Sequence, residues 1–304
     1  MISIIIPTYN RNEILYPILE KIHNELPKEL YELIVINDSK TTQVILKDEW
    51  TSTMKCLKNP KSGVASARNL GVKNSKFEWL LFLDDDMVLS IENFETYLNW
   101  IQKKEPFIVN LDWKYSDETN SELMLSTFGR YLLKIGYNSL RGWNDFPEWG
   151  DNEIVKVDSI ASCNLLLSKK DFNTINGYDE NFPFSGAEDF DFSERLKSLH
   201  VPRYIDLSSF TIHNELDHLT FKKWLYRQFR GGITKRIAFE KGYNEQEIKF
   251  QTKYRFPIFL NSICLSLFFV TKRFGFLDKF SFKLINAMVG QAIHSGFHNQ
   301  KISF

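Results

Sequence analysis

Short apolar runs alternate with amphipathic stretches over the first third of the chain. Residues 2–6 are mostly β-branched and end at Pro7, a pattern typical of a strand that is buried on both faces. Apolar residues then recur at helical spacing over 14–22, with Asn10 as the expected N-cap. Further strands are predicted at 33–36, 54–57 and 79–83, and a helix at 64–72. This alternation predicts an α/β fold with a mostly parallel central sheet flanked by helices.

Three consecutive aspartates follow the last of these predicted strands. Asp84, Asp85 and Asp86 repel one another, and each raises the pKa of its neighbours. A divalent cation such as Mg²⁺ or Mn²⁺, or a cationic ligand, would relieve that repulsion. A solvated turn is the alternative, since Asp is common in turns. Asp38 and Arg68 are expected at the same edge of the sheet, where ligands gather outside the carboxyl ends of parallel strands, and this favours a ligand site.

Composition limits the classes of function. The 304 residues carry 38 Lys plus Arg and 38 Asp plus Glu, so the net charge is zero and no nucleic-acid partner is expected. Cys56, Cys163 and Cys264 have no metal-site or disulfide spacing and indicate a reducing compartment. The first residues do not resemble a signal peptide, and the apolar stretch 256–270 is short and interrupted by polar residues. A cytoplasmic protein is therefore expected.

A second acidic cluster follows Gly186. Glu188, Asp189 and Asp191 lie at or near the start of a helix predicted at 190–199, where the helix dipole stabilises anions. Simple helix capping is the alternative interpretation. A carboxylate here could also take a proton from an attacking hydroxyl group.

Two further kinds of side chain are candidates. His213 ends the apolar run 210–213, although a lone histidine is more often structural than metal-bound. The aromatic residues of 112–154 either stack on sugar rings or fill the core, and the core is expected for most of them. Trp143 and Trp149, flanked by glycine and charged residues, are the expected exceptions.

The segments IIIPTYNR, VINDS, GVASARNLG, FLDDD and GAEDFDFSERL stand in the order seen in glycosyltransferase family 2, which the chain resembles over roughly residues 1–240. The resemblance implies a GT-A fold, a Rossmann-like sheet with a DxD metal motif. It implies a catalytic domain over 1–240, with a nucleotide-sugar-binding half at 1–110 and an acceptor-binding, catalytic half at 111–240. A helical, basic and aromatic extension is expected at 241–304.

The resemblance also implies roles for single residues. Donor contacts would come from Pro7, Thr8, Tyr9, Asp38, Arg68, Asp84, Asp85, Arg227 and Arg230. Asp86 would bind the metal, Mn²⁺ or Mg²⁺, and His213 would complete the site, with His218 as the fallback. The register of the three aspartates stays open by one position. For Arg227 and Arg230, a solvated helix face is the alternative.

The acceptor side is assigned in the same way. Asp189 would be the general base and Glu188 would bind acceptor or sugar hydroxyls, while Asp191 and Arg195 would hold the helix in place. Acceptor contacts are expected from Trp143, Trp149 and Asn164.

The predicted function is inverting, metal-dependent transfer of a sugar from a nucleotide-sugar, with a UDP-sugar favoured. The acceptor would be a hydroxyl of a glycan or lipid-linked glycan, in bacterial surface-polysaccharide synthesis such as capsule formation. A sugar-nucleotide pyrophosphorylase would carry a Gly-rich basic loop after the first strand, where PTYNRNE stands instead. A non-catalytic nucleotide-sugar-binding protein is disfavoured by the presence of Asp84, Asp86 and Asp189 together.

The tail suggests a second partner. Basic residues flank the apolar stretch within 249–283, as in helices that lie on an anionic membrane surface. The expected contact is peripheral, on the inner face of the cell membrane. A helical subdomain that packs on the catalytic domain, or a homodimer, is the alternative.

Overall fold

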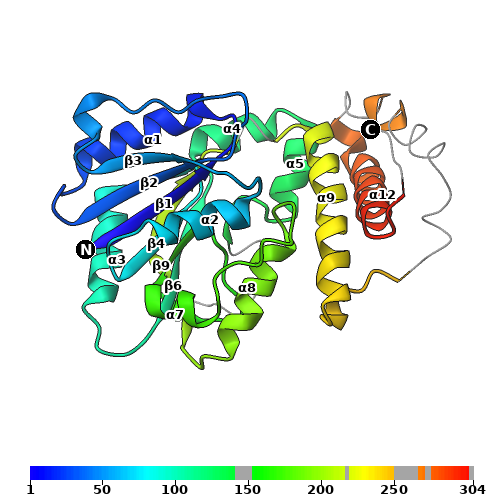
Figure 1. The fold of residues 1–304 in the computed structure, drawn as a ribbon. Coiled ribbons are helices and arrows are strands. Elements are labelled where there is room, and N and C mark those ends of the chain that lie inside the picture. The colour runs from blue at the N-terminus through cyan, green and yellow to red at the C-terminus, as the bar shows by residue number, and fades with distance from the viewer. Residues whose placement is uncertain (141–152, 216–218, 250–265, 271–274, 301–304) are drawn as a thin grey trace. The chain divides into compact units, whose positions relative to one another are not determined.

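The computed structural model describes residues 1–140, 153–215, 219–249, 266–270 and 275–300. The chain divides into two compact units, each assembled from three segments (Figure 1). The sheet unit comprises Met1–Lys114, Phe146–Pro183 and Glu188–Asn214. The helical unit comprises Tyr115–Asp145, Phe184–Ala187 and Glu215–Phe304.

The described strands form one sheet in the order β3-β2-β1-β4-β8-β6-β9-β5, with β7 paired to β9. Four neighbouring strands are parallel: β1 (Ile2–Thr8), β2 (Tyr31–Asn37), β3 (Met54–Lys58) and β4 (Trp79–Leu83). Strand β8 (Asn164–Ser168) is antiparallel to β4 and to β6 (Ile108–Lys114), and β6 is parallel to β9 (Arg203–His213). The short strands β5 (Met87–Val88) and β7 (Ile154–Lys156) run antiparallel to β9. The four strands predicted in the first third of the chain are confirmed.

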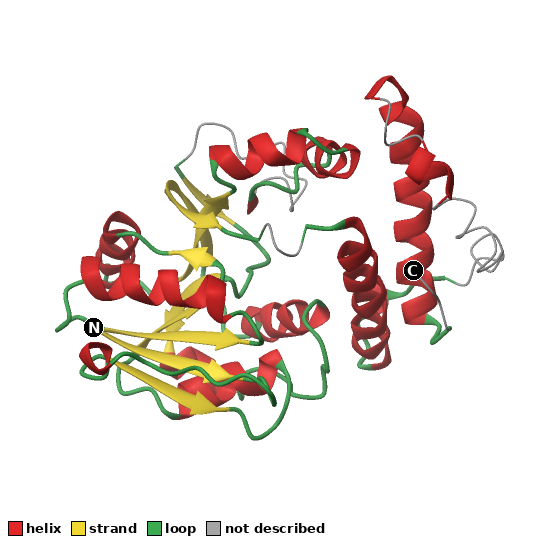
Figure 2. Ribbon diagram, turned by 90° about the horizontal axis from the view of Figure 1, so that it is seen from above, coloured by secondary structure: helices red, strands yellow, loops and turns green. Residues whose placement is uncertain are grey.

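Helices cover the two faces of this sheet, as Figure 2 shows. They are α1 (Asn12–Glu25), α2 (Val64–Lys73), α3 (Ile91–Ile101), α7 (Lys169–Thr174) and α8 (Ala187–Lys197), with the 3₁₀ turn η1 (Asp48–Trp50). Every residue of β1 and β2 is buried, which explains why these strands are apolar without alternation. The expected cap of the first helix is wrong in detail. Asn10 has a left-handed φ of 57°, and the helix begins after Arg11.

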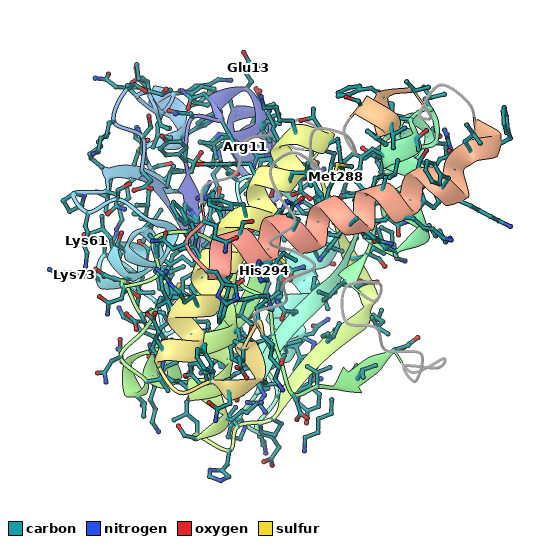
Figure 3. The ribbon with its side chains drawn as sticks, turned by 90° about the vertical axis from the view of Figure 1, so that its right-hand side faces the viewer. Arg11, Glu13, Lys61, Lys73, Met288 and His294 are labelled. Carbon is teal, nitrogen blue, oxygen red and sulfur yellow. The ribbon has the colours of Figure 1, made fainter. Side chains whose placement is uncertain are left out.

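The helical unit contains α4 (Asp117–Met124), α5 (Thr127–Lys134), α9 (Phe221–Glu240) and α12 (Asp278–Phe297), with the 3₁₀ turns η4 (Asn244–Gln246) and η5 (Gly275–Leu277). Helices α9 and α12 pack at very close range (Figure 3). A Cβ on Gly232 would lie 2.1 Å from the carbonyl oxygen of Ile293, and one on Gly296 would lie 2.0 Å from that of Phe229. Two glycines therefore let the backbones of the two helices touch.

Aromatic residues between 112 and 137 mostly fill the cores of the two units, as predicted. Trp113, Tyr115, Phe128 and Tyr131 are each no more than 5% exposed. Within the described part of the chain, no helix combines the length and the apolar character that crossing a membrane requires. Most of the apolar stretch 256–270 lies outside the described residues.

Helix α2 sits directly on β1 through Gly71. A Cβ at this position would lie 2.3 Å from Cγ2 of Ile5, whose side chain is fully buried. Because α2 also carries Arg68, this close approach sets how far Arg68 stands from the carboxyl ends of the strands.

The first prediction follows from this contact. Gly71→Ala should lower the free energy of unfolding by about 1–3 kcal/mol, because the added methyl overpacks the α2–β1 contact. The matched control is Gly231→Ala in α9, where a Cβ meets nothing within 4 Å and alanine favours the helix by about 1 kcal/mol. Urea unfolding of both variants measures the difference. Equal stabilities would contradict the packing argument.

Candidate active site

The aspartates after β4 are held by a hydroxyl group at the end of β1 and by a guanidinium group from the segment that follows β1. Thr8 Oγ1 donates to Asp85 Oδ2 at 2.6 Å. Arg11 Nη1 donates to Asp85 Oδ1 at 2.7 Å and to Asp86 Oδ2 at 2.8 Å. Arg11 is labelled in Figure 3. The side chain of Arg11 is therefore a cationic partner of two of the three aspartates.

The three carboxylates differ in their electrostatic surroundings. Burial raises the pKa of Asp85 to about 7, although Arg11 opposes the shift. Burial also raises the pKa of Asp84, with Arg68 acting against it. For Asp86, burial acts in the same direction but is outweighed by His213 and Arg11, so its pKa falls below the ordinary value. Asp86 is therefore the carboxylate of the run that is firmly ionised.

His213 lies beside Asp86 because β5 and β9 are paired. Met87 stands opposite His213 in that pairing, and Nε2 of His213 is 3.4 Å from Asp86 Oδ1. The ring of His213 meets Trp113 edge-on, with centroids 4.7 Å apart. Oδ1 of Asp86 is buried, and apart from this contact with His213 it has no hydrogen-bond partner among the described residues. The pair thus presents one carboxylate oxygen and one imidazole nitrogen to a common point.

Arg68 joins the aspartate run to the second acidic cluster. Its side chain is 4% exposed, and Nη2 lies 3.1 Å from Asp84 Oδ1. Nη1 lies 3.3 Å from Glu188 Oε1 and 3.3 Å from Asp189 Oδ1. Acids from the end of β4 and the first turn of α8 therefore meet at one buried guanidinium. The predicted convergence of these motifs is present in the structure.

The two acids at the start of α8 differ in accessibility. The side chain of Asp189 is 30% exposed, whereas that of Glu188 is 1% exposed. Ser162 donates through Oγ to Asp189 Oδ1 and through its backbone N–H to Oδ2 at 3.4 Å. Asp191 is fully buried and accepts from Arg195 Nε at 2.8 Å, so this pair anchors the helix. Only Asp189 of the Glu-Asp pair can reach a bound substrate.

Asp38 lies at the carboxyl end of β2, where the fold holds its carboxylate in place. Both of its oxygens accept the backbone N–H of Gly63, at 3.1 and 3.0 Å, and Asn59 Nδ2 donates to Oδ1 at 2.6 Å. Gly63 has a φ of 126°, which a residue with a Cβ rarely adopts. Near the end of β1, Pro7 is buried and the ring of Tyr9 is 58% exposed.

The predicted acceptor-side residues and the fallback histidine have different outcomes. Trp143, Trp149 and the fallback His218 lie outside the described residues. Asn164 is fully buried and donates to Leu111 O and Thr211 Oγ1 at 3.0 Å, so it joins strands and has no surface for an acceptor.

Arg227 and Arg230 lie within α9 of the helical unit. Arg227 pairs there with Glu215, and Arg230 stacks over the ring of Phe184 at 4.1 Å. Their expected contact with the donor stays a prediction.

Sequence reasoning missed Arg11, Ser162 and Tyr178. Arg11 stands inside the segment PTYNR, so a basic residue just past a strand end was a usable signal. Ser162 and Tyr178 have no local sequence signature. Ser162 bonds to Asp189, which lies 27 residues later, and to Tyr178, which lies 16 residues later.

Comparison with known proteins identifies the family to which the chain is similar. The model described as glycosyl transferase family 2 matches residues 3–162, and that described as the N-terminal domain of galactosyltransferase matches 152–208. An uncharacterized glycosyltransferase of Haemophilus influenzae is 26% identical over 73% of this chain and 68% of its own length. The poly(ribitol-phosphate) β-N-acetylglucosaminyltransferase TarP of Staphylococcus aureus is 31% identical over 42% of this chain and 36% of its own. Other curated bacterial relatives are matched over only 20–23% of their length.

A solved structure supports the fold. The mannosyltransferase PcManGT of Pyrobaculum calidifontis, in complex with GDP-Man and Mn²⁺, aligns with a TM-score of 0.56 at 9% identity, over 99% of this chain and 88% of its own. This likeness confirms the predicted GT-A architecture. Since the family model matches more than half of the residues, the chain belongs to glycosyl transferase family 2.

Proposed function

We propose that the chain is an inverting glycosyltransferase that moves a sugar from a nucleotide-sugar to a hydroxyl of a glycan, with Asp189 as the general base. One observation supports this above all others. The accessible carboxylate of Asp189 and that of Asp84 lie on two nitrogens of the same buried guanidinium, Arg68, at 3.3 and 3.1 Å. A base and the acids after β4 thus share one site, as a single displacement requires.

The proposed transfer needs no reactant besides the nucleotide-sugar and the acceptor. The acceptor oxygen attacks the anomeric carbon while its proton passes to the carboxylate of Asp189. The bond from that carbon to the diphosphate breaks, and the nucleoside diphosphate leaves with the electron pair. Because one base acts in one displacement, the anomeric configuration inverts.

Asp86 and His213 are the residues that would hold a divalent metal. The buried Oδ1 of Asp86 and Nε2 of His213, 3.4 Å apart, offer donors that suit Mn²⁺ or Mg²⁺. Among the described residues, no group of three or more His, Cys, Asp or Glu side chains is arranged for a metal. Donor phosphates and water would then complete the coordination. Such an ion would offset the charge of the leaving diphosphate.

The donor side is assigned to the ends of β1 and β2. The held carboxylate of Asp38 would accept hydrogen bonds from the base or ribose, and the exposed ring of Tyr9 would lie against the base. A UDP-sugar is the favoured donor. The GDP-Man and Mn²⁺ bound by PcManGT support a nucleotide-sugar and a divalent ion in general.

A bacterial surface polysaccharide is the proposed setting. In support, the name of the Staphylococcus relative describes transfer of N-acetylglucosamine to poly(ribitol-phosphate). Peripheral membrane contact through 249–283 and a homodimer remain predictions, since much of that range lies outside the described residues. The exposed Lys279 and Lys283 on α12 agree with such a contact.

The test is a panel of UDP- and GDP-sugars with Mn²⁺, Mg²⁺ or EDTA. Release of the nucleoside diphosphate is measured with and without glycan acceptors. Metal-dependent turnover of one donor, with an inverted product by NMR, is the expected result. A retained configuration would overturn the proposed displacement.

Asp189→Asn should lower turnover by about 10²–10⁴-fold, because the amide cannot accept the proton of the acceptor hydroxyl. Donor affinity, measured by calorimetry, should stay within twofold or so of the original if the base acts only in chemistry. Asp158→Asn is the matched control, since that side chain is 94% exposed. Unchanged turnover in Asp189→Asn would remove it as the base.

Asp86→Ala should weaken the metal-dependent part of donor binding by about 10- to 100-fold, since the carboxylate oxygen is lost from the proposed metal site. Titration of the protein with Mn²⁺ alone, followed by electron paramagnetic resonance, gives a readout that needs no turnover. Asp158→Ala serves as the control here. Original Mn²⁺ affinity in the Asp86 variant would refute the assignment.

A further inference from the structure

The carboxylate of Asp189 is held by groups that the proposed reaction does not yet use. Oδ1 lies between Arg68 Nη1, at 3.3 Å, and the hydroxyl of Ser162, which donates to it. Oδ2 has a weaker contact, the backbone N–H of Ser162 at 3.4 Å. Ser162 is fully buried and therefore cannot itself contact a substrate.

The hydroxyl of Ser162 is in turn hydrogen-bonded to that of Tyr178. Each hydroxyl has one proton to donate, and an ionised carboxylate only accepts. Since Ser162 donates to Asp189, Tyr178 must donate to Ser162. Burial raises the pKa of Tyr178, so its phenol keeps the proton that this order requires. The result is a directed chain from Tyr178 through Ser162 to Asp189.

Tyr178 is itself fixed by α2. Asn69 Nδ2 donates to the carbonyl oxygen of Tyr178, and the N–H of Tyr178 donates to Asn69 Oδ1, both at 2.9 Å. Gly177, with a φ of 65°, makes room for this clamp, because a Cβ there would lie 2.7 Å from Asn69 Oδ1. The ring of Tyr178 stacks on Phe192 of α8, with centroids 4.0 Å apart.

Two adjacent residues of α2 therefore act on Asp189 from different sides. Arg68 binds Oδ1 directly, and Asn69 holds the tyrosine that orders Ser162. Both effects fix the plane of the carboxylate and occupy Oδ1 with hydrogen bonds.

We propose that Ser162, ordered by Tyr178, is the positioning residue for Asp189 and leaves Oδ2 as the oxygen that receives the acceptor proton. The proposal rests on the proposed function, in which Asp189 is the base. Without Ser162, the carboxylate would be less well oriented toward the acceptor hydroxyl.

The test compares Ser162→Ala with Ser193→Ala. Ser193 is also a buried serine, and its Oγ accepts from the backbone N–H of Ile160 at 3.2 Å; among the described residues its hydroxyl forms no hydrogen bond with the carboxylate of Asp189. Ser162→Ala should lower kcat by about 10- to 100-fold, the loss of one hydrogen bond to a charged group, with KM for the donor little changed. Donor affinity measured by calorimetry should stay unchanged, which separates lost positioning of the base from a damaged fold. Ser193→Ala should leave both kcat and KM unchanged.

Tyr178→Phe keeps the ring and the backbone clamp and removes only the first hydroxyl of the chain. It should show the same loss of kcat at smaller size, and it provides the test if Ser162→Ala does not fold.

Equal kcat values for the Ser162, Tyr178 and Ser193 variants would overturn the positioning role of Ser162. If Asp189→Asn is inactive in that case, the proposed base still stands. Full activity of Asp189→Asn would instead overturn the base itself, whatever the serine variants do.

Discussion

The buried guanidinium of Arg68 is the interaction on which the candidate site depends. It contacts Asp84 after β4 and both Glu188 and Asp189 at the start of α8. Removing one partner of a buried charge network leaves the others uncompensated, so this arrangement is costly to disturb. One side chain thereby fixes the distance between the proposed base and the donor-side acids.

Negative charge still exceeds positive charge around this centre. Arg11 contacts Asp85 and Asp86, while Arg68 contacts Asp84, Glu188 and Asp189. Five acids thus share two guanidinium groups and the nearby His213. An excess of this kind attracts cations, which is the electrostatic reason for placing a divalent ion at Asp86. The pKa of Asp85 is raised and that of Asp86 is lowered, so the nearby positive charges do not compensate these two carboxylates equally.

Local patterns predicted the elements well because the sheet is buried on both faces. The apolar run 2–6 could only be a covered strand, and its order with the helices that follow implied parallel pairing. The structural role of a glycine was harder to predict from the sequence. Gly232 follows Arg227 and Arg230, from which donor contacts are expected, yet its absent side chain lets α9 touch α12. Helix packing and ligand binding both favour glycine, so composition alone does not separate them.

The family motifs, the strand edge and the acids of the site could all be inferred from residues in chain order. The hydrogen-bond partners of these acids could not be inferred in this way. Ser162 and Tyr178 are an ordinary serine and tyrosine until folding places them against Asp189 and Asn69. Hydrophobic periodicity and charge clusters are local properties that a one-dimensional pattern contains. Hydrogen bonds between residues distant along the chain depend on strand order and helix placement, and these exist only once the core has packed.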